Sequence, residues 1–501
     1  MKRIPIRVSW IVCFFPVLFS NQLLGKEQPN IIFFATDDLS DWISPMGYSQ
    51  AITPNMDRLA RAGVTFQNAH TAGTYCAPSR TAIFSGRHVS TTGCYRGQIY
   101  FVADPEIKPL QVALQEAGYK TMGGGKLFHH TFGQIDFRGW DEYFHRDESA
   151  KLEGWPLKDW SLDTPFLPQP YPNSVYNQSD RPTKAPWFLE WGPVLNEHEE
   201  EMADTKRINW VCQKLMEPQQ EPFFLAVGIY APHFPNYVPQ KYFDLYDRDS
   251  LVPPDYLETD LDDLPEHVRK AKTARGRIHK HLESIDAVKD AIHGYLASVS
   301  YADAMLGRVL DTLAKSPYRG DTILVLWSDH GYHHGQKFDW GKHNLWERTS
   351  NVPLLWAGPG IARNQSVDTT VSLIDLYPTL MDLAGIPVDP ELDGTSLAGV
   401  LADPSTARDR DVLLPGLEPE EYAIINQDWR YIRYANGTEE LYDLQNDPNE
   451  WNNLAGNPEY DEVKTKLADS APQTFAPPAY QLNDYRMVTN GETFTWVKKE
   501  K

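Results

Sequence analysis

Cysteines, basic runs and long apolar stretches are all scarce in this sequence of 501 residues. Four cysteines are too few to form the framework of a disulfide scaffold of this length. The 47 basic residues are outnumbered by 68 acidic ones and form no run, so the net charge of −21 argues against a nucleic-acid binder. Beyond residue 25 no apolar stretch approaches about 18 residues, so we expect no membrane-spanning helix in the mature chain. Hydrophobic residues make up 41% of the chain, which excludes disorder and indicates a globular, acidic enzyme.

The first 25 residues have the pattern of a secretory signal. Three basic residues precede an apolar run over residues 8–19, and small or polar residues follow up to Gly25. The run is too short to span a bilayer, and it contains Pro16. We therefore predict a signal peptide over residues 1–25 and export to the periplasm or the exterior. Its removal changes the net charge to −24 and leaves an odd number of cysteines, Cys76, Cys94 and Cys212.

Buried strands and helices alternate along the chain. Residues 30–35, 222–230 and 322–327 are continuous apolar runs, which are typical of strands in a parallel sheet covered on both faces. Helical patterns follow at residues 54–62, between Thr53 and Gly63, and at residues 292–314. This alternation predicts an α/β fold, with a mostly parallel central sheet sandwiched by helices.

Acidic residues follow two of these predicted strands directly. Asp37 and Asp38 come after the first strand, and Asp329 and His330 come after the third. In parallel sheets ligands bind beyond the carboxyl ends of the strands, so both clusters are expected at the functional edge.

Two further stretches have a distinct composition. Residues 151–200 hold eight Pro and four Trp with little periodicity, and we interpret them as an irregular insertion in the α/β core. The charged residues 257–290 are interpreted as the solvated face of helices.

The pattern changes near residue 400. Residues 429–434 and 439–444 flank Asn436-Gly437, which is a strong signal for a β-hairpin. We therefore predict a catalytic domain over residues 26–400 and a smaller C-terminal α+β subdomain with an antiparallel sheet over residues 401–501.

The sharpest motif is CAPSR, from Cys76 to Arg80. A chance C-x-P-x-R pattern is expected in only about one or two such chains per hundred. Taken alone, the motif is also compatible with a buried free cysteine beside a turn proline.

CAPSR resembles the signature of type I sulfatases, in the alkaline phosphatase superfamily. In that family the cysteine is oxidised after translation to formylglycine (3-oxoalanine), an aldehyde whose hydrate attacks sulfur. The resemblance extends over nearly all of the mature chain, in the family's order: IIFFATDDLS, CAPSRTAIFSGR, GGGKLFH, APH and SDHGYHHGQKFDWGKHNLWE. GKLFH and the Asp-His pair resemble the iduronate-2-sulfatase branch of bacterial polysaccharide sulfatases. The resemblance implies an alkaline-phosphatase-like fold, sulfatase activity, and a maturation enzyme that generates formylglycine from Cys76.

The carboxylates also indicate a metal site. Asp37, Asp38 and Asp329 are hard oxygen ligands suited to Ca²⁺ or Mg²⁺, and without a cation they would repel one another. The resemblance implies one calcium ion, with Cys76 as formylglycine and His330 in the ligand set. Because nitrogen is an unusual ligand of calcium, His330 either binds the metal or donates a hydrogen bond beside it. The alternative for the Asp pair is a helix cap or a turn.

An anionic sulfate ester requires positive charge and a positioned nucleophile. We expect a helix to begin near Ser79, so that its amino end and Arg80 both face the sulfate. The three glycines before Lys126 allow a tight turn and close backbone approach, since the full phosphate-loop pattern is absent. The resemblance assigns contacts with the sulfate and the nucleophile to Lys126, and the regenerating base to His129.

The leaving group has its own predicted residues. His233 follows a predicted strand and can protonate the departing alkoxide of a sugar, which is a poor leaving group. By resemblance Lys342 binds a sulfate oxygen on that side. Flanking residues that could line a sugar pocket are His88, Tyr95, Arg96, His130, His333, His334, Trp340, His343 and Trp346, although ordinary loop packing accounts for any one of them as well.

The leading hypothesis is an exported, calcium-dependent formylglycine sulfatase acting on a uronate- or deoxysugar-containing sulfated polysaccharide or its oligosaccharides. The branch resemblance favours a 2-O-sulfated uronate, and the net charge of −24 favours short oligosaccharides over long polyanions. The alternatives are a phosphonate or phosphodiester hydrolase, a choline or aryl sulfatase, and a non-catalytic binder of sulfated glycans. Cys94 and Cys212 either pair or stay free.

Overall fold

The computed structural model describes residues 28–129, 134–144, 189–489 and 494–500. The predicted signal peptide, most of the predicted 151–200 insertion, and His130 lie outside the described residues.

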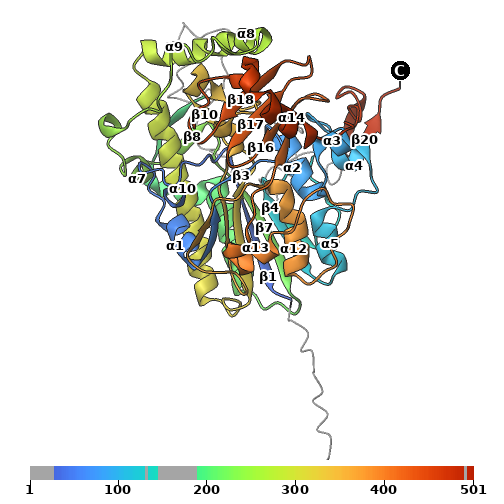
Figure 1. Ribbon diagram of the computed structural model, residues 1–501. Coiled ribbons are helices and arrows are strands. Elements are labelled where there is room, and N and C mark those ends of the chain that lie inside the picture. The colour runs from blue at the N-terminus through green and yellow to red at the C-terminus, as the bar shows by residue number, and fades with distance from the viewer. Residues whose placement is uncertain (1–27, 130–133, 145–188, 490–493, 501) are drawn as a thin grey trace, which may run out of the picture.

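An eight-stranded sheet forms the centre of the molecule (Figure 1). Its order is β13-β2-β12-β9-β1-β7-β4-β5, and within it only β12 runs antiparallel to its neighbours. The strands are β1 (Asn30–Asp37), β2 (Gly63–Phe66), β4 (Lys120–Gly125), β5 (Glu142–Phe144), β7 (Phe223–Pro232), β9 (Thr322–Ser328), β12 (Leu354–Ala357) and β13 (Gln365–Val367). The predicted α/β fold with a mostly parallel sheet is confirmed.

Helices cover both faces of this sheet because successive strand side chains point to opposite sides. Along β1, Ile32 and Phe34 pack into the core beneath α1 (Pro54–Ala62), α6 (Ala203–Met216) and α10 (Val288–Lys315). Ile31 and Phe33 pack into the opposite core, beneath α2 (Cys76–Ser85), α5 (Leu110–Glu116) and α12 (Leu376–Leu383). The two cores explain why β1 is a continuous apolar run.

The predicted boundaries of α1 agree with the structure more closely than those of α10. α1 starts at Pro54 and ends before Gly63, as predicted, although the Thr53 side chain does not cap it. α10 begins at Val288 and is longer than predicted. The charged stretch 257–290 contains α8 (Glu266–Arg275) and α9 (Arg277–Ser284), which lie at the top of the molecule in Figure 1.

The other short elements connect these layers. They are β3 (Ala69–His70), α3 (Val89–Thr92), α4 (Tyr100–Ala103), β6 (Trp191–Val194), β8 (Asn236–Pro239), α7 (Gln240–Phe243), β10 (His333–His334), β11 (Trp340–Gly341), α11 (Glu347–Ser350), β14 (Val371–Ser372) and α13 (Ala398–Ala402). Among the described segments, no helix combines the length and the apolar character needed to cross a membrane.

A four-stranded antiparallel sheet follows in the C-terminal region, made of β15 (Val412–Pro415), β16 (Tyr422–Ile425), β17 (Trp429–Arg433) and β18 (Glu439–Asp443). The predicted hairpin around Asn436-Gly437 is present, with Gly437 at φ +81°. One face of this sheet packs against α8 and Trp346, and the other packs against α14 (Asp461–Asp469). β19 (Tyr485–Thr489) and β20 (Phe494–Lys498) form a separate hairpin.

Candidate functional site

The predicted site residues converge at one edge of the central sheet. β1, β4, β7 and β9 are mutually parallel, so their carboxyl ends lie together. Each of these ends supplies side chains to the site, and the full set from the four strands is Asp37, Asp38, Lys126, His233, Asp329 and His330.

Two consecutive acidic residues reach the same site because the chain turns between them. In an extended strand Asp37 and Asp38 would point to opposite faces. Asp38, however, has φ +62°, a left-handed conformation that Asp adopts more readily than most residues. Both side chains are fully buried.

α2 begins at Cys76, so the prediction of a helix start near Ser79 is wrong by about one turn. Tyr75 before it is extended, and all ten residues of the helix are buried. Cys76 therefore occupies the first turn, where unpaired backbone N–H groups give partial positive charge. Arg80 follows one turn later, and the Ser79 hydroxyl donates to the Asp329 carbonyl at 2.6 Å, which fixes α2 against the end of β9.

Charged and polar groups surround the Cys76 sulfur. His330 Nε2 lies 3.2 Å from Sγ, Lys342 Nζ 3.4 Å and Lys126 Nζ 3.9 Å. The thiol also donates to Asp37 Oδ1 at 3.4 Å. Cys76 is 1% exposed, so these contacts form in a nearly water-free environment.

Buried cations pair with the three carboxylates. Arg80 donates from Nε to Asp329 Oδ2 at 2.7 Å and lies 3.6 Å from Asp37 Oδ1. Lys126 forms an ion pair with Asp37, and Lys342 binds Asp38 Oδ1 at 2.6 Å. Arg80 also binds the backbone carbonyls of two strand ends, those of Thr36 and Lys126.

The two neighbouring carboxyls differ in acidity. Burial would raise the pKa of Asp37, but the cations Lys126, Arg80 and Lys342 together hold it well below its usual range. Burial raises the pKa of Asp38 to about 7, because Lys342 only partly offsets the burial and the charge of Asp37 adds to it. Asp38 Oδ2 accepts no hydrogen bond from the described residues, so it can take a cation.

The histidines fall into two classes. Burial lowers the pKa values of His129 and His233, and nearby Lys126 and Lys342 lower them further, so both rings are neutral. His233 Nδ1 donates to the Phe234 carbonyl, and its Nε2 lies 3.7 Å from Asp38 Oδ2. His330 is different: burial would lower its pKa, but Asp329 and other anions raise it to about 9.

The donor set fits a hard divalent cation. Asp37, Cys76, Asp329 and His330 each offer a ligand atom, and these atoms lie within 4.8 Å of one another. A second group with the same spacing joins Asp38 and His233 to Cys76. Three of the six residues in the combined set are carboxylates, the ligand type that Ca²⁺ or Mg²⁺ prefers. His330 donates from Nδ1 to the Gly331 carbonyl at 2.9 Å and leaves Nε2 facing the sulfur, so both alternatives for it stay open.

Of the two uses expected for the glycines before Lys126, a tight turn and close backbone approach, the structure confirms the close approach at Gly125. Gly123 and Gly124 lie inside β4, and only Gly125 has a positive φ, at +71°. A Cβ on Gly125 would lie 2.1 Å from the Gly228 carbonyl oxygen, so close packing against β7 requires glycine. This contact fixes the end of β4, from which Lys126 projects.

Most of the predicted sugar-pocket residues are used elsewhere. His333, His334, Trp340 and Trp346 are at most 2% exposed. His334 stacks on Trp42 with ring centroids 4.3 Å apart, while the Trp346 indole donates to Glu440 at 2.8 Å. His334, Trp340 and Trp346 stabilise the loops around the site, whereas His333 lines a small pocket together with Arg348 and Glu450.

The described rim of the site contains a residue that the sequence did not single out. Tyr75, directly before the CAPSR motif, packs against His129 at 5.7 Å and against the exposed His343 at 4.7 Å. Arg96 is half exposed and paired with Glu418. Among the remaining candidates, Tyr95 donates to the Ala476 carbonyl. Tyr75 could have been identified from the sequence only by its position directly before Cys76.

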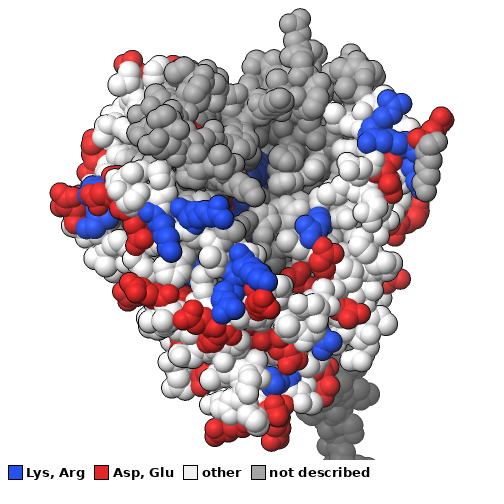
Figure 2. All heavy atoms as spheres, turned by 90° about the horizontal axis from the view of Figure 1, so that it is seen from above, with Lys and Arg blue, Asp and Glu red and all other residues white. Residues whose placement is uncertain are grey.

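Charges of both signs meet on the face above the site. Figure 2 shows Lys and Arg side chains interleaved with Asp and Glu, without an extended basic field over the described residues.

Cys76, Cys94 and Cys212, the cysteines of the described chain, are all free, so Cys94 and Cys212 do not pair.

Known proteins are similar to this chain in sequence and in fold. Residues 29–386 match the sulfatase family, and residues 333–474 match the family described as N-sulphoglucosamine sulphohydrolase, C-terminal. The chain is 35% identical to a sulfatase of Formosa agariphila, over 90% of this chain and 87% of that protein. It is 28% identical to the choline-sulfatase of Rhizobium meliloti, over 86% and 83% of the two chains. It is 26% identical to the ulvan-active sulfatase of Formosa agariphila, over 88% and 80%.

Solved structures resemble the fold at lower identity. The phosphonate monoester hydrolase of Agrobacterium radiobacter superposes with a TM-score of 0.71 at 20% identity, over 95% of this chain and all of that one. A 2-O GAG sulfatase superposes with a TM-score of 0.65 at 22% identity, over 88% and 91% of the chains. These likenesses establish the architecture of the large sheet and its helices.

Proposed function

The chain belongs to the sulfatase family and is a sulfate-ester hydrolase, and we propose that it removes O-sulfate from a carbohydrate with formylglycine at position 76 and one calcium ion. The observation that carries this proposal is the ring of charge around a buried cysteine. Lys126, Lys342 and His330 lie within 3.9 Å of its sulfur, at the amino end of a helix. A structural cysteine has no need of such surroundings, whereas an anionic group bound there does.

Each of the two added groups supplies a defined chemistry. Formylglycine, formed from Cys76 by a maturation enzyme, supplies a hydrated aldehyde as the nucleophile toward sulfur. Calcium supplies positive charge that polarises a sulfate oxygen and offsets the carboxylates. Asp37, Asp38 and Asp329 would hold the calcium together with the residue at position 76, and His330 would either complete the set or donate a hydrogen bond to it.

The surrounding side chains bind and orient the reacting groups. Arg80, tied to three strand ends, neutralises charge at the base of the site. Lys126 and Lys342 bind sulfate oxygens from two sides of position 76. His129 is neutral, so it can accept a proton from the hydroxyl group at position 76 when sulfate is released and the aldehyde returns.

Departure of the alcohol requires a proton in the other direction. His233 can donate it from Nε2 only when both ring nitrogens are protonated, because the Phe234 carbonyl already holds the proton on Nδ1 and keeps the ring oriented. The negative charge of a bound sulfate ester favours this protonated form. One water molecule supplies the oxygen and hydrogen atoms that hydrolysis adds. The net reaction therefore converts a sulfate ester and water into an alcohol and sulfate.

For the substrate, we propose a 2-O-sulfated uronate or a similar sugar, as in the iduronate-2-sulfatase-like branch. The ulvan-active relative and the 2-O GAG sulfatase fold are consistent with a sulfated polysaccharide or its oligosaccharides. Tyr75 and His343 form an aromatic rim whose rings are tilted by 40° to each other, and either ring face suits a sugar ring. Arg96, which is half exposed, can exchange its partner Glu418 for a uronate carboxylate.

The chain around the site is proposed to have three parts. Residues 1–25 are an export signal, residues 26–400 form the catalytic domain with residues 151–200 as an insertion, and residues 401–501 form the C-terminal subdomain. Export would place the enzyme in the periplasm or outside the cell, where sulfated polysaccharides occur.

Choline sulfate is a second candidate substrate, because the choline-sulfatase relative covers most of both chains. The phosphonate hydrolase of similar fold makes phosphonate and phosphodiester substrates a third candidate.

A panel of esters tests these proposals directly. The mature chain would be produced with a formylglycine-generating enzyme and assayed on uronate-hexosamine disaccharides sulfated at O2 of the uronate or at O6 of the hexosamine. Choline sulfate, 4-nitrophenyl sulfate and phenyl phosphonate would be assayed beside them, with Cys76→Ala as the control. We expect the highest kcat/KM on the 2-O-sulfated disaccharide and no turnover by the variant. A higher kcat/KM on choline sulfate or phenyl phosphonate would contradict the carbohydrate assignment.

A further inference from the structure

The segment from Lys337 to Glu347 carries Lys342 into the catalytic site from outside the strand ends. It includes β11 and leads into α11. Near its middle, His343 N donates to the Thr74 carbonyl at 3.0 Å, two residues before Cys76. Beside this contact in the middle, the contacts that hold the two ends of the segment fix the path of the backbone that carries Lys342.

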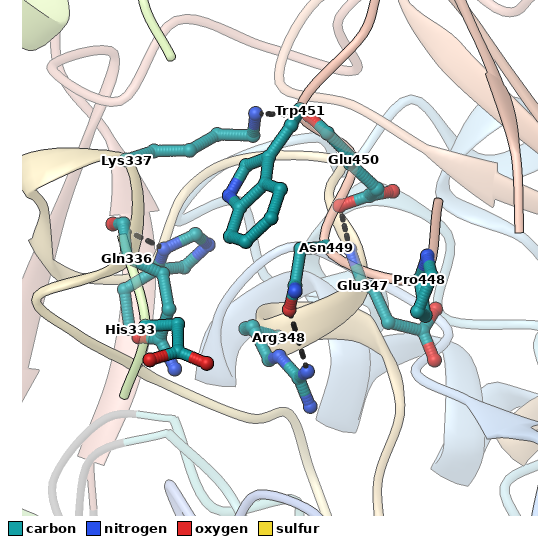
Figure 3. A pocket seen from close by; sticks show the side chains of 10 residues that line it. His333, Gln336, Lys337, Glu347, Arg348, Pro448, Asn449, Glu450 and Trp451 are labelled. Atoms are coloured by element: carbon teal, nitrogen blue, oxygen red, sulfur yellow. Dashed lines mark hydrogen bonds between the residues drawn. The ribbon is translucent and has the colours of Figure 1, made fainter. Parts of the chain in front are cut away.

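One residue of the C-terminal subdomain, Glu450, contacts both ends. At the first end, Lys337 Nζ donates to the Glu450 carbonyl at 2.6 Å and to Asp260 Oδ1 at 2.7 Å. At the second end, Glu347 N donates to Glu450 Oε2 at 2.9 Å. Figure 3 shows Glu450 between these two partners, with both contacts drawn as dashed lines.

Arg430 on β17 adds further contacts at the second end of the segment. Its NH1 donates to the Leu345 carbonyl at 2.7 Å, and its NH2 pairs with the Glu347 carboxylate. Its Nε lies 2.6 Å from Glu450 Oε1 without the alignment of a hydrogen bond, so this contact is an ion pair. Arg430 is fully buried and Glu450 is 2% exposed, so water does not compete with these contacts.

The backbone of the segment also needs external support. Lys337, Phe338 and His343 have φ values of +50°, +53° and +73°, and Glu450 itself has φ +56°. Residues with a Cβ rarely adopt these conformations, and they persist only where surrounding contacts fix them.

We propose that Glu450 is a positioning residue of the sulfatase site, which holds both ends of the 337–347 segment so that Lys342 stands beside position 76. The C-terminal subdomain thereby completes the active site without touching the substrate. This inference rests on the proposed role of Lys342 in binding sulfate.

A double-mutant cycle separates this role from a general contribution to folding. Glu450→Ala and Lys342→Met would be made singly and together in the full mature enzyme, and kcat/KM would be measured on 4-nitrophenyl sulfate. Glu450→Gln keeps an oxygen acceptor for Glu347 N and serves as the milder variant. The matched control is Asp303→Asn, because Asp303 is equally buried and accepts backbone N–H groups from Asn55 and Met56 on the α1–α10 side.

Hydrogen exchange of the peptides that cover residues 337–347 provides a second readout, independent of turnover. Glu450→Ala removes the carboxylate contacts with Glu347 N and Arg430 but keeps the backbone carbonyl that Lys337 binds, so it releases the second end of the segment. We expect it to lower kcat/KM about tenfold and to speed exchange in this segment, with a smaller effect for Glu450→Gln. Asp303→Asn should change neither quantity. In the Lys342→Met background, Glu450→Ala should lower kcat/KM by less than about twofold, because its effect passes through Lys342.

Three results would overturn the proposal: wild-type kcat/KM in a folded Glu450→Ala variant, an equal loss in both backgrounds, or unchanged exchange over residues 337–347. If Glu450→Ala does not fold, the same criteria apply to Glu450→Gln. If instead Lys342→Met alone retains full activity, or the wild type does not turn over the ester, the proposed role of Lys342 fails, and the exchange measurement still decides whether Glu450 holds the segment.

Discussion

Replacing Lys342 by methionine would remove one positive charge from the wall of the catalytic site while keeping most of the side-chain length. The ammonium group is charged throughout the usual pH range of an assay. Burial would lower its pKa, but Asp38, Cys76 and the carboxylates of Asp37 and Asp329 raise it well above its ordinary value. Lys342 is 6% exposed and lies 3.4 Å from the Cys76 sulfur, so its charge acts on a bound sulfate with little screening by water.

The size of the effect follows from this geometry. Removing one preorganised donor from a site that stabilises a developing anion costs about 10²–10³-fold in rate, or about 3–4 kcal/mol. The same change leaves Asp38 without its contact at 2.6 Å, although His330 remains at 3.3 Å. Breaking a buried ion pair costs about 3–5 kcal/mol. Because His330 still contacts Asp38, we expect a loss of folding free energy at the lower end of this range, about 3 kcal/mol.

The loss of stability should also depend on pH in metal-free protein. The folded pKa of Asp38, about 7, is above its ordinary value, so the contribution of Asp38 to the stability of the wild type declines as the pH rises toward 7. Lys342 is the main group that lowers this pKa, so the variant should have a higher pKa and its stability should continue to decline above pH 7. The difference between the two proteins should therefore be larger at pH 8 than at pH 6.

The assay combines steady-state kinetics on 4-nitrophenyl sulfate with thermal unfolding of chelator-treated protein. Arg410→Met is a suitable control, because it breaks the ion pair with buried Asp375 outside the site. We expect it to lower the unfolding temperature but to leave kcat/KM unchanged. A folded Lys342→Met enzyme with wild-type kcat/KM would refute the assignment of Lys342 to sulfate binding.

Three further predictions follow from the site. Chelation should lower activity at least about tenfold and calcium should restore it, with an added unfolding free energy of about 2.7 kcal/mol at a concentration of 100 times Kd; full activity in metal-stripped protein would contradict the calcium site. His233→Ala should lower kcat on a sugar sulfate by about 10²–10⁴-fold but affect 4-nitrophenyl sulfate much less, since nitrophenolate leaves without protonation, so equal losses on both would exclude His233 as the acid. Tyr75→Ala should raise KM for a sulfated disaccharide by about 2–10-fold and leave KM for choline sulfate unchanged, whereas equal shifts would exclude a sugar platform at Tyr75.

The central sheet could be predicted from the sequence because its strands are buried on both faces. A continuous apolar run such as residues 30–35 is too short for a buried helix and matches the length of a covered strand, and strong boundary residues such as Pro54 and Gly63 defined α1. The hairpin at Asn436-Gly437 followed from local turn chemistry alone.

The convergence of Asp37, Cys76, Lys126 and Asp329 could also be expected, because parallel strands end at one edge. The start of α2 at Cys76 was missed because Pro78 fits anywhere in a first helical turn, and so did not fix the boundary. The glycines before Lys126 suggested a tight turn and close backbone approach, and the close approach is found between Gly125 and β7.

Contacts between distant segments account for what the sequence did not reveal. Nothing local to Glu450 or Arg430 indicates that they hold the segment of Lys342, because the partners are about a hundred residues away along the chain. Likewise, His334 and Trp346 looked available for a sugar, and only the tertiary structure shows that they are buried against other side chains.

The most direct test of the proposed chemistry is the mass of the tryptic peptide of residues 62–80, which contains Cys76, from protein made in a host with a formylglycine-generating enzyme. The formylglycine mechanism predicts a peptide lighter than the encoded one, because an aldehyde replaces the thiol-bearing group, and this species should increase in proportion to the sulfatase activity of the preparation. An intact thiol in fully active enzyme would contradict formylglycine as the nucleophile.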